Sequence, residues 1–240
     1  MTDSETSESG SPIYRHKAKD REWIAPENEG LHLEEIQTHL DEHLGTVETV
    51  FHELVSDVIH LDVLFLPAHP DKPYHSLVTS GVSDRPMAVP DDMEDFSRVE
   101  LMVHLPADWP LDQQSLKNDE NYWPIRWLKM IGRLPHDFDT WIGYGHTIPN
   151  GNPAEPIANT PFTSVMLMPP YWHDPDFYQL QTKSGAKIFF FILMPLYQTE
   201  LDLKLKKGVD DLEALFEKNE IGPVVDLGRK NVAKKKGWFR

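Results

Sequence analysis

Two glycine-containing segments hold most of the side chains that could do chemistry. Residues 79–87 read TSGVSDRPM, and residues 140–151 read TWIGYGHTIPNG. Histidine and aspartate are common general acids and bases, so His146 acting with Asp84 or with Asp62 would give a hydrolase or another acid–base enzyme. Glycine beside polar and aromatic residues is equally typical of loops that bind a partner. The two segments therefore leave catalysis and binding as alternatives.

A complete catalytic set is missing from the sequence. The chain has no cysteine and no G-x-S-x-G nucleophile motif, and the G-x-G at 143–145 is too short for a dinucleotide or phosphate loop. His60 and Asp62 share a strand face at a period of two, and Glu100 and His104 share another. Because no nucleophile accompanies them, we interpret these pairs as ion pairs or hydrogen-bonded residues at the edge of the core.

Three histidines could form a metal site on the first expected helix. His39 and His43 are four residues apart, and His32 falls near the same face at 3.6 residues per turn. Imidazole clusters of this kind can bind zinc. The histidines flank the apolar stripe, however, and no H-E-x-x-H sequence is present. We interpret them as the polar rim of a buried face, keep a metal-binding module as an alternative, and predict no metal or other cofactor.

Aromatic residues favour the binding alternative. They are dense in residues 122–144 and again in 169–178, PPYWHDPDFY. Most of these rings should lie in the core, but aromatic side chains in rigid loops are frequent anchors of protein interfaces. The predicted recognition surface consists of Asp84, Arg85, Trp141, Tyr144 and His146, with Asp62 and Glu100 as supporting polar residues.

Length and charge narrow the class of protein. The chain has 240 residues, 40% of them hydrophobic, and a formal net charge of −16. These values allow one large domain and argue against nucleic acid or an anionic membrane as the partner. The polar N-terminus lacks an apolar signal region, and the apolar run at 188–195 is too short to span a bilayer. With no cysteine, we expect a cytoplasmic protein; its oligomeric state stays open.

Hydrophobic periodicity predicts the elements that must position these residues. Residues 1–27 are expected to form a mobile polar arm, residues 28–228 the folded domain, and residues 229–240 a solvated basic tail. Helices are expected at 33–45, at 123–134, where Pro135 should end the helix, at 198–207 and at 209–219. Strands are expected at 47–54, 59–66, 74–80, 98–105, 140–144, 163–168 and 187–196. This order predicts an α+β domain with a mixed, largely antiparallel sheet covered by helices.

Five motifs together resemble the Suppressor of fused domain family, in the form of a single-domain bacterial protein. They are His75–Asp84 (HSLVTSGVSD), 98–102 (RVELM), 122–128 (YWPIRWL), 141–146 (WIGYGH) and 164–170 (SVMLMPP). The resemblance covers roughly residues 31–232. Each motif alone is weak, but their order and number make the match specific.

The resemblance implies an α/β sandwich-like fold and a binding role without known catalytic activity. The animal relative restrains a transcription factor in Hedgehog signalling, and it holds a peptide of that factor as an added strand beside a second, C-terminal domain. That second domain is expected to be absent here, so the Hedgehog function is not carried over. In the family, the acidic loop at 91–95 occupies a partner-facing position.

Bacterial members of this family are inferred from gene neighbourhoods to include immunity proteins that neutralise polymorphic toxins. An acidic body would suit a basic toxin by electrostatic complementarity. We therefore predict a non-enzymatic protein-binding domain that acts as an immunity protein. The acid–base enzyme described above remains the alternative.

Overall fold

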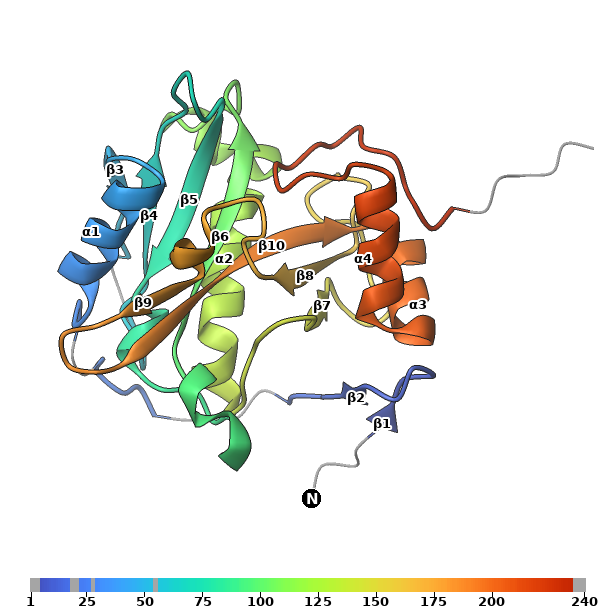
Figure 1. Cartoon of the computed structure of the whole chain (residues 1–240), viewed down its shortest axis with the longest axis horizontal. Helices are drawn as coiled ribbons and strands as arrows, with labels where there is room; N and C mark the ends of the chain where they lie inside the picture. The colour runs from blue at the N-terminus through green and yellow to red at the C-terminus, as the bar shows by residue number, and fades with distance from the viewer. Residues whose placement is uncertain (1–4, 18–21, 27–28, 54–55, 235–240) are drawn as a thin grey trace, which may run out of the picture.

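One mixed sheet runs through the domain (Figure 1). The computed structural model describes residues 5–17, 22–26, 29–53 and 56–234. The strands of this sheet are β3 (Thr49–Phe51), β4 (Asp62–Leu66), β5 (Tyr74–Ser80), β6 (Val99–Pro106), β7 (Thr147–Pro149), β8 (Ser164–Met168), β9 (Gln179–Gln181) and β10 (Lys187–Leu196). The helices are α1 (Leu33–His43), α2 (Asp119–Phe138), α3 (Gln198–Lys207) and α4 (Val209–Lys218), with short 3-10 turns η1 (Val82–Asp84), η2 (Asp91–Phe96), η3 (Ser115–Lys117) and η4 (Pro175–Tyr178).

The strand order is β3-β4-β5-β6-β10-β8-β7, with β9 also paired to β10. Only the β10–β6 pair is parallel among these pairs, and the other ladders are antiparallel. The predicted α+β class and the mixed, largely antiparallel sheet are thus confirmed. Strand β10 is central because its residues are apolar on both faces.

Each face of the sheet has its own apolar layer. On β6, Val99, Leu101 and their alternate neighbours pack with Trp127 and Leu128 of α2. Met102, on the opposite face of β6, packs in a second cluster that includes residues of α1 and α4. Figure 1 shows α2 behind the sheet, with α1 and the α3–α4 pair in front. The period-two pattern of β6 therefore predicted its two faces correctly.

Helix α2 is longer than expected at both ends. It begins at Asp119, four residues before the expected start, and the Asn118 side chain caps its first turn by accepting a hydrogen bond from the backbone N–H of Glu120. Pro135 lies inside the helix and does not end it. The helix ends instead at Asp139, which is left-handed with a φ of 50°.

The strand expected at 140–144 is absent, because these residues form a loop. The loop reaches the sheet edge only at its end, where the backbone N–H of Gly145 donates to the carbonyl of Leu167 and the N–H of Leu167 donates to the carbonyl of His146, each at 2.9 Å. The strand β7 begins one residue later, at Thr147. The apolar residues Trp141 and Ile142 gave the strand signal, but they pack beside the sheet.

Parts of both termini are folded onto the domain. Within the expected mobile arm, β1 (Glu5–Thr6) pairs with β2 (Pro12–Ile13), and the N–H of Ser9 donates to the carbonyl of Leu205 in α3 at 3.0 Å. Residues 1–4, 18–21 and 27 of that arm lie outside the described residues. A sequence without apolar periodicity can still form a short hairpin when a neighbouring helix supplies the contacts.

The basic tail expected from residue 229 begins with a buried residue. The Arg229 side chain is 7% exposed and forms an ion pair with the fully buried Glu200 at 2.5 Å. Its guanidinium also lies over the rings of Phe162, Tyr197 and Phe216. The folded domain therefore extends past residue 228, whereas residues 235–240 of the tail lie outside the described residues.

Within the described ranges, none of the helices combines the length and the apolar character needed to cross a membrane.

Candidate functional site

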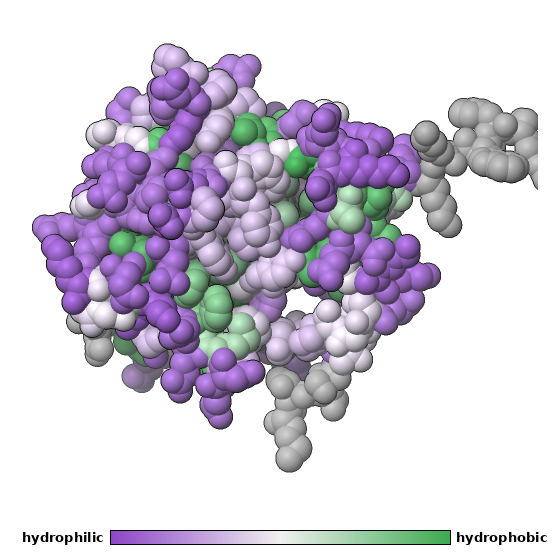
Figure 2. All heavy atoms as spheres, in the orientation of Figure 1, coloured by the Kyte–Doolittle hydropathy of each residue, from purple (hydrophilic) through white to green (hydrophobic). Residues whose placement is uncertain are grey.

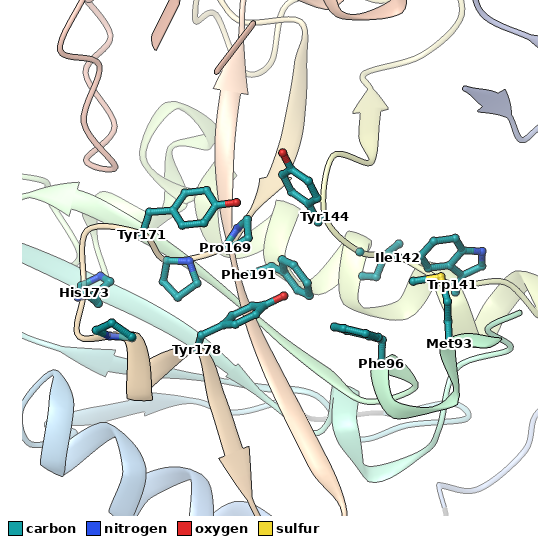
Figure 3. Close-up of a pocket in the computed structure, with 13 residues that line it drawn as sticks. Met93, Phe96, Trp141, Ile142, Tyr144, Pro169, Tyr171, His173, Tyr178 and Phe191 are labelled. Atoms are coloured by element: carbon teal, nitrogen blue, oxygen red, sulfur yellow. The ribbon is translucent and has the colours of Figure 1, made fainter. Parts of the chain in front are cut away.

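A cavity of about 600 Å³ opens beside the central strand β10 (Figure 3). On one edge of β10, β9 pairs with residues 187–189 and β8 pairs with residues 192–196. Phe191 lies between these two ladders. The cavity forms at this gap and is lined by Met93, Phe96, Trp141, Ile142, Gly143, Tyr144, Pro169, Pro170, Tyr171, His173, Pro175, Tyr178 and Phe191.

Four segments far apart in the sequence supply this lining. Turn η2 contributes Met93 and Phe96, the α2–β7 loop contributes residues 141–144, the β8–β9 connection contributes residues from 169–178, and β10 contributes Phe191. Prolines stiffen the last segment, because their φ angles are fixed. Ring packing holds the floor of the cavity, where Tyr178 contacts Phe191 edge-on with centroids 5.7 Å apart.

The polar groups of the cavity are neutral near pH 7. Burial raises the pKa of Tyr178 to about 12 and lowers the pKa of His173 to about 4. The pKa of Tyr144 is also raised, first by burial and then by its hydrogen bond to Glu213. Neutral phenols donate hydrogen bonds but are poor general bases at this pH. The cavity thus offers apolar contact and a few hydrogen bonds, which is typical of a binding site.

A second hollow of about 800 Å³ shares Tyr171 with the cavity. Its other lining includes Trp172 and four acidic residues of α4 and its end, Asp210, Glu213, Glu217 and Glu220. The hydroxyl of Tyr144 donates to Glu213 Oε2 at 2.9 Å and so links the two hollows. On the face of the molecule drawn in Figure 2, the surface over the β8–β9 connection is pale and is surrounded by purple, hydrophilic residues.

Aromatic rings remain exposed at the boundary of the two hollows. Tyr171 is 61% exposed, Trp172 42% and Tyr144 40%. Large exposed aromatic side chains beside a cavity mark a surface that can bury area against a partner.

Two of the sequence-predicted residues, Trp141 and Tyr144, line the cavity. His146 lies directly behind Trp141, with ring centroids 4.3 Å apart. Burial lowers the pKa of His146 to about 4, so this imidazole is neutral and supports the indole. The second glycine-containing segment therefore contributes to the candidate site.

The first glycine-containing segment is mostly buried. Asp84 is 6% exposed and accepts a hydrogen bond from the N–H of Gly30 at 2.9 Å, so it points inward and not to a partner-facing surface as predicted. Arg85, the next residue, is exposed. The N–H of Ala88 donates to the carbonyl of Thr140 at 3.2 Å, which places the two segments side by side.

Glu100 supports this first segment from inside the core. Its side chain is fully buried and accepts hydrogen bonds from the hydroxyls of Thr79 and Ser83 and from the N–H groups of Gly81 and Ser83. Burial nevertheless raises the pKa of Glu100 to about 7, against the effect of these donors. A carboxyl group in this position fixes a turn and cannot touch a partner directly.

Asp62 lies on β4 and His146 lies just before β7, far across the sheet, so the pairing of His146 with Asp62 lacks the geometry of an acid–base site. Five strand spacings separate β4 from β7, roughly 24 Å at about 4.8 Å per strand. Asp62 contacts His52 and His60, while Asp84 contacts Gly30. Among the described residues, no hydrogen bond or ion pair joins His146 to either aspartate.

The helix-one histidines also do not converge. His39 is buried, and its Nε2 hydrogen-bonds the carbonyl of Phe177 at 3.0 Å. Among the described residues, only His52, His60 and Asp62 form a cluster with metal-ligand spacing, so the alternative metal site of His32, His39 and His43 is not formed. His32 and His39 instead lie in the packed interface of the helix.

Sequence reasoning missed several lining residues, including Phe96, Tyr178 and Phe191. The signal for Tyr178 was its place in the aromatic and proline-rich segment 169–178. Phe191 lies in a strand that reads as core, and only the gap between β8 and β9 exposes it to the cavity.

The model of the family "Suppressor of fused protein (SUFU)" matches residues 57–230. A solved SUFU homolog from Neisseria gonorrhoeae FA 1090 has a TM-score of 0.58 and 17% identity, covering 85% of this chain and 96% of that chain. The crystal structure of the Sufu–Fu complex has a TM-score of 0.58 and 16% identity, covering 87% of this chain and 93% of that chain. The crystal structure of Drosophila Suppressor of Fused has a TM-score of 0.56 and 14% identity, covering 90% of this chain but 54% of that chain.

A search of curated proteins finds no match. The structural likenesses are below 25% identity, so they establish the fold and not the partner. The family model covers most of the domain, including the segments that form the cavity and the Glu100 turn. This chain belongs to the Suppressor of fused family.

Proposed function

We propose that this chain is a cytoplasmic, non-enzymatic protein-binding domain whose partner docks over the aromatic cavity and the adjoining acidic hollow. The observation that carries this proposal is the row of exposed rings, Tyr144, Tyr171 and Trp172, at the junction of the two hollows. Such rings bury large apolar areas at low entropic cost and often dominate binding energy.

Fold likeness supports a binding role without naming the partner. One of the similar solved structures is a complex, Sufu with Fu. The pKa values of His173, about 4, and Tyr178, about 12, also lie far from the pKa near 7 that suits a general acid or base at neutral pH. Both observations favour recognition over catalysis.

Charge favours a basic partner. Acidic residues flank the aromatic surface on two sides, at Asp91, Asp92 and Glu94 of η2 and at Asp210 and Glu217 of α4, and all five are exposed. The chain as a whole has a formal net charge of −16. Complementary charge steers association and selects among partners, and salt screens it. We therefore propose that the partner is a basic bacterial toxin and that this chain is its immunity protein.

The binding proposal is tested with the full chain as bait and one matched pair of variants. Tyr171→Ala removes the most exposed ring of the site, whereas Met130→Ala removes an exposed apolar side chain of α2 that does not line either hollow. We expect a native-host protein that wild type and Met130→Ala retain, and that Tyr171→Ala binds about tenfold more weakly or worse. Equal binding by both variants would refute the proposed binding site. Recovery of no protein partner, together with turnover of a small substrate, would refute the binding function itself.

The immunity proposal needs a separate measurement. The captured protein is expressed alone and together with this chain, and growth of the host cells is followed. We expect growth inhibition that wild type relieves and Tyr171→Ala does not, with binding that weakens as salt rises. A harmless partner would reject the immunity role and leave the binding role intact.

A further inference from the structure

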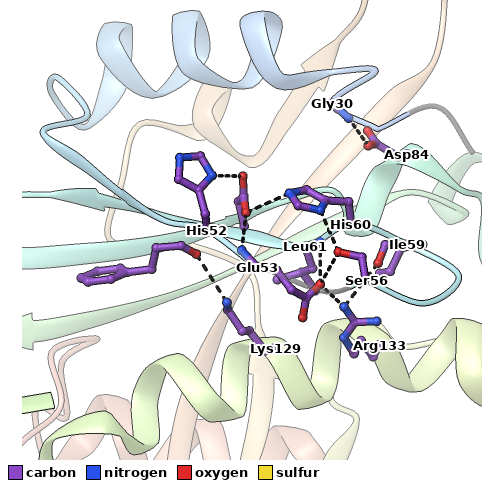
Figure 4. Close-up of polar contacts among 12 residues, drawn as sticks. Gly30, His52, Glu53, Ser56, Ile59, His60, Leu61, Asp84, Lys129 and Arg133 are labelled. Atoms are coloured by element: carbon purple, nitrogen blue, oxygen red, sulfur yellow. Dashed lines mark hydrogen bonds and ion pairs between the residues drawn. The ribbon is translucent and has the colours of Figure 1, made fainter. Parts of the chain in front are cut away.

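A second site is built where β3 leads into β4, separate from the aromatic cavity. The β3–β4 ladder pairs Phe51 with Val63, so the next residues along, His52 and Asp62, face each other. His60 precedes Asp62 by two residues and shares its face. The His52 Nδ1 atom lies 2.9 Å from Asp62 Oδ2, and the His60 Nε2 atom lies 3.1 Å from Asp62 Oδ1 (Figure 4).

We propose that His52, His60 and Asp62 bind one divalent transition-metal ion, for which Zn²⁺ is the suitable probe. One ligand atom from each residue lies within 4.8 Å of the others. Zinc bonds to histidine nitrogen and carboxylate oxygen measure about 2.0–2.2 Å, so tetrahedral neighbours lie roughly 3.3 Å apart. The two nitrogen–oxygen distances need to open by a few tenths of an ångström, and the two histidine nitrogens, which lie within 4.8 Å of each other, need to approach by at most about 1.5 Å to hold the ion.

The hydrogen bonds around His60 prepare its Nε2 atom to act as a ligand. Ser56 Oγ lies 3.0 Å from Glu53 Oε2 and 2.7 Å from His60 Nδ1. Because a carboxylate only accepts, the Ser56 hydroxyl donates to Glu53, and the contact with His60 then requires a proton on Nδ1. In the neutral ring the Nε2 lone pair then faces the Asp62 Oδ1 atom, so two acceptors meet, and a proton or a metal cation between them would satisfy both.

This arrangement supplies the outer support that metal-binding histidines usually have. A metal-bound imidazole generally donates its other N–H to a polar group, which fixes its tautomer and orientation. Here the chain is His60 to Ser56 to Glu53, and Glu53 is held in turn by an ion pair with Arg133. The N–H of Glu53 also donates to Asp62 Oδ1 at 3.0 Å, which orients the carboxylate.

Access and charge fit a partly open site. The side chains of Asp62 and His60 are 11% and 25% exposed, whereas that of His52 is 66% exposed, so an ion can enter from the His52 side. Three protein ligands leave a coordination position for water. Two imidazoles and a carboxylate suit zinc-type ions better than Mg²⁺ or Ca²⁺, which prefer oxygen.

Lys129 of α2 is the competing cation at this site. Its ammonium interacts electrostatically with Asp62 and Glu53, and it lies 3.4 Å from the carbonyl of Phe51. Removing this charge should therefore favour a bound dication. The metal proposal does not depend on the partner-binding proposal, because none of its residues lines the aromatic cavity or the acidic hollow.

The test is calorimetric titration of the untagged, chelator-treated full chain with ZnCl₂, with MgCl₂ as the hard-ion comparison. We expect one Zn²⁺ per chain, no comparable Mg²⁺ binding, and a Zn²⁺-dependent rise in Tm. Bound Co²⁺ should show the visible absorption of a nitrogen- and oxygen-ligated ion. His52→Ala should weaken Zn²⁺ binding at least tenfold without unfolding the chain, since this side chain is largely exposed.

Two further variants make the result decisive. His69→Ala is the matched control, because His69 is also an exposed histidine beside an aspartate, Asp71, at 4.0 Å, but lies outside the cluster. It should bind Zn²⁺ like wild type, and Lys129→Gln should bind several-fold more tightly. The proposed site would be overturned if the wild type showed no saturable Zn²⁺ binding, or if binding survived both His52→Ala and Asp62→Asn. Unchanged or weaker Zn²⁺ binding by Lys129→Gln would also overturn it.

Discussion

The two glycine-containing segments have similar compositions but opposite relations to solvent. In 79–87, Thr79 and Ser83 are completely buried and Asp84 is 6% exposed. In 140–151, Tyr144 is 40% exposed at the mouth of a cavity. One segment uses its polar groups to hold a turn inside the protein, and the other places aromatic rings at the mouth of a cavity.

The difference comes from what lies beneath each segment. Glu100 on β6 points at the first segment and accepts four hydrogen bonds from it, so burial of the polar groups is compensated. The second segment runs past the end of β8, where the sheet edge is open between β8 and β9. Glycine beside polar and aromatic residues thus marks a tight, buried turn in one case and a loop that lines a cavity in the other.

The largest expected contrast is between two glycine-to-alanine changes. A Cβ at Gly81 would lie 1.9 Å from the backbone oxygen of His60, at a φ of +116°, so Gly81→Ala should cost more than ~4 kcal/mol or prevent folding. A Cβ at Gly143 would lie 3.1 Å from the Trp141 ring, which can tilt, so Gly143→Ala should cost about 1 kcal/mol. Urea unfolding measures the free energy of unfolding of both variants, and similar losses of stability would contradict the difference between the two segments.

Next in size is the removal of the buried carboxyl group. Glu100→Ala leaves several buried donors without an acceptor and should cost about 4 kcal/mol in the free energy of unfolding. Glu100→Gln keeps one acceptor oxygen and should cost about 1–2 kcal/mol. Equal stability of the two variants in chemical denaturation would show that the hydrogen bonds do not hold the turn.

Acidification should weaken both segments, and the first one more. In the first segment, the carbonyl of Val82 is hydrogen-bonded at 3.1 Å by Nε2 of His136, which is 7% exposed. Burial lowers the pKa of His136 to about 4. Burial also lowers the pKa of His146, in the second segment, to about 4, although this side chain is more exposed. A depressed histidine pKa means that stability is full above the unfolded value of about 6.5 and is lost as pH falls towards 4.

The corresponding measurement is the free energy of unfolding at pH 7, 6 and 5. Wild type should lose stability on acidification, and His136→Gln should reduce that loss by up to about 1.4 kcal/mol per pH unit. His146→Gln should reduce it less. The background is the same in every variant: His104 and His173 add to the loss, whereas Glu100, whose pKa is raised to about 7, adds stability as the pH falls and offsets part of it. A larger effect of His146→Gln would reverse the order of burial inferred for the two segments.

The smallest expected change is the removal of the Tyr144 hydroxyl. Tyr144→Phe loses a hydrogen bond to Glu213 at a solvated rim and should cost less than about 1 kcal/mol. Thr79→Val removes a hydroxyl of the buried network, which donates to Glu100 and accepts from the N–H of Leu101, and should cost about 2–3 kcal/mol. Thermal unfolding of this pair compares hydroxyl loss in the two segments, and equal shifts in Tm would contradict their different burial.

Much of the architecture was predictable because local patterns and tertiary packing agree. The stripe of α1, the alternation of β6 and the uniformly apolar β10 each correspond to a buried face. The errors lie where non-local contacts dominate: the loop at 140–144 has strand-like composition but no paired neighbour, and Arg229 has a tail-like sequence but an ion pair with Glu200.

The sequence by itself determined the α+β order of elements, the acidic charge and the family resemblance, because periodicity, composition and motif order are properties of the chain. It also predicted Trp141 and Tyr144 as part of a recognition surface, and both residues line the cavity. Only the tertiary structure decided that Asp84 and Glu100 are buried, that Phe191 reaches a cavity, and that His52 meets Asp62 across two strands. The physical reason is that burial and convergence depend on which strands are neighbours, and strand pairing joins residues that the sequence keeps far apart.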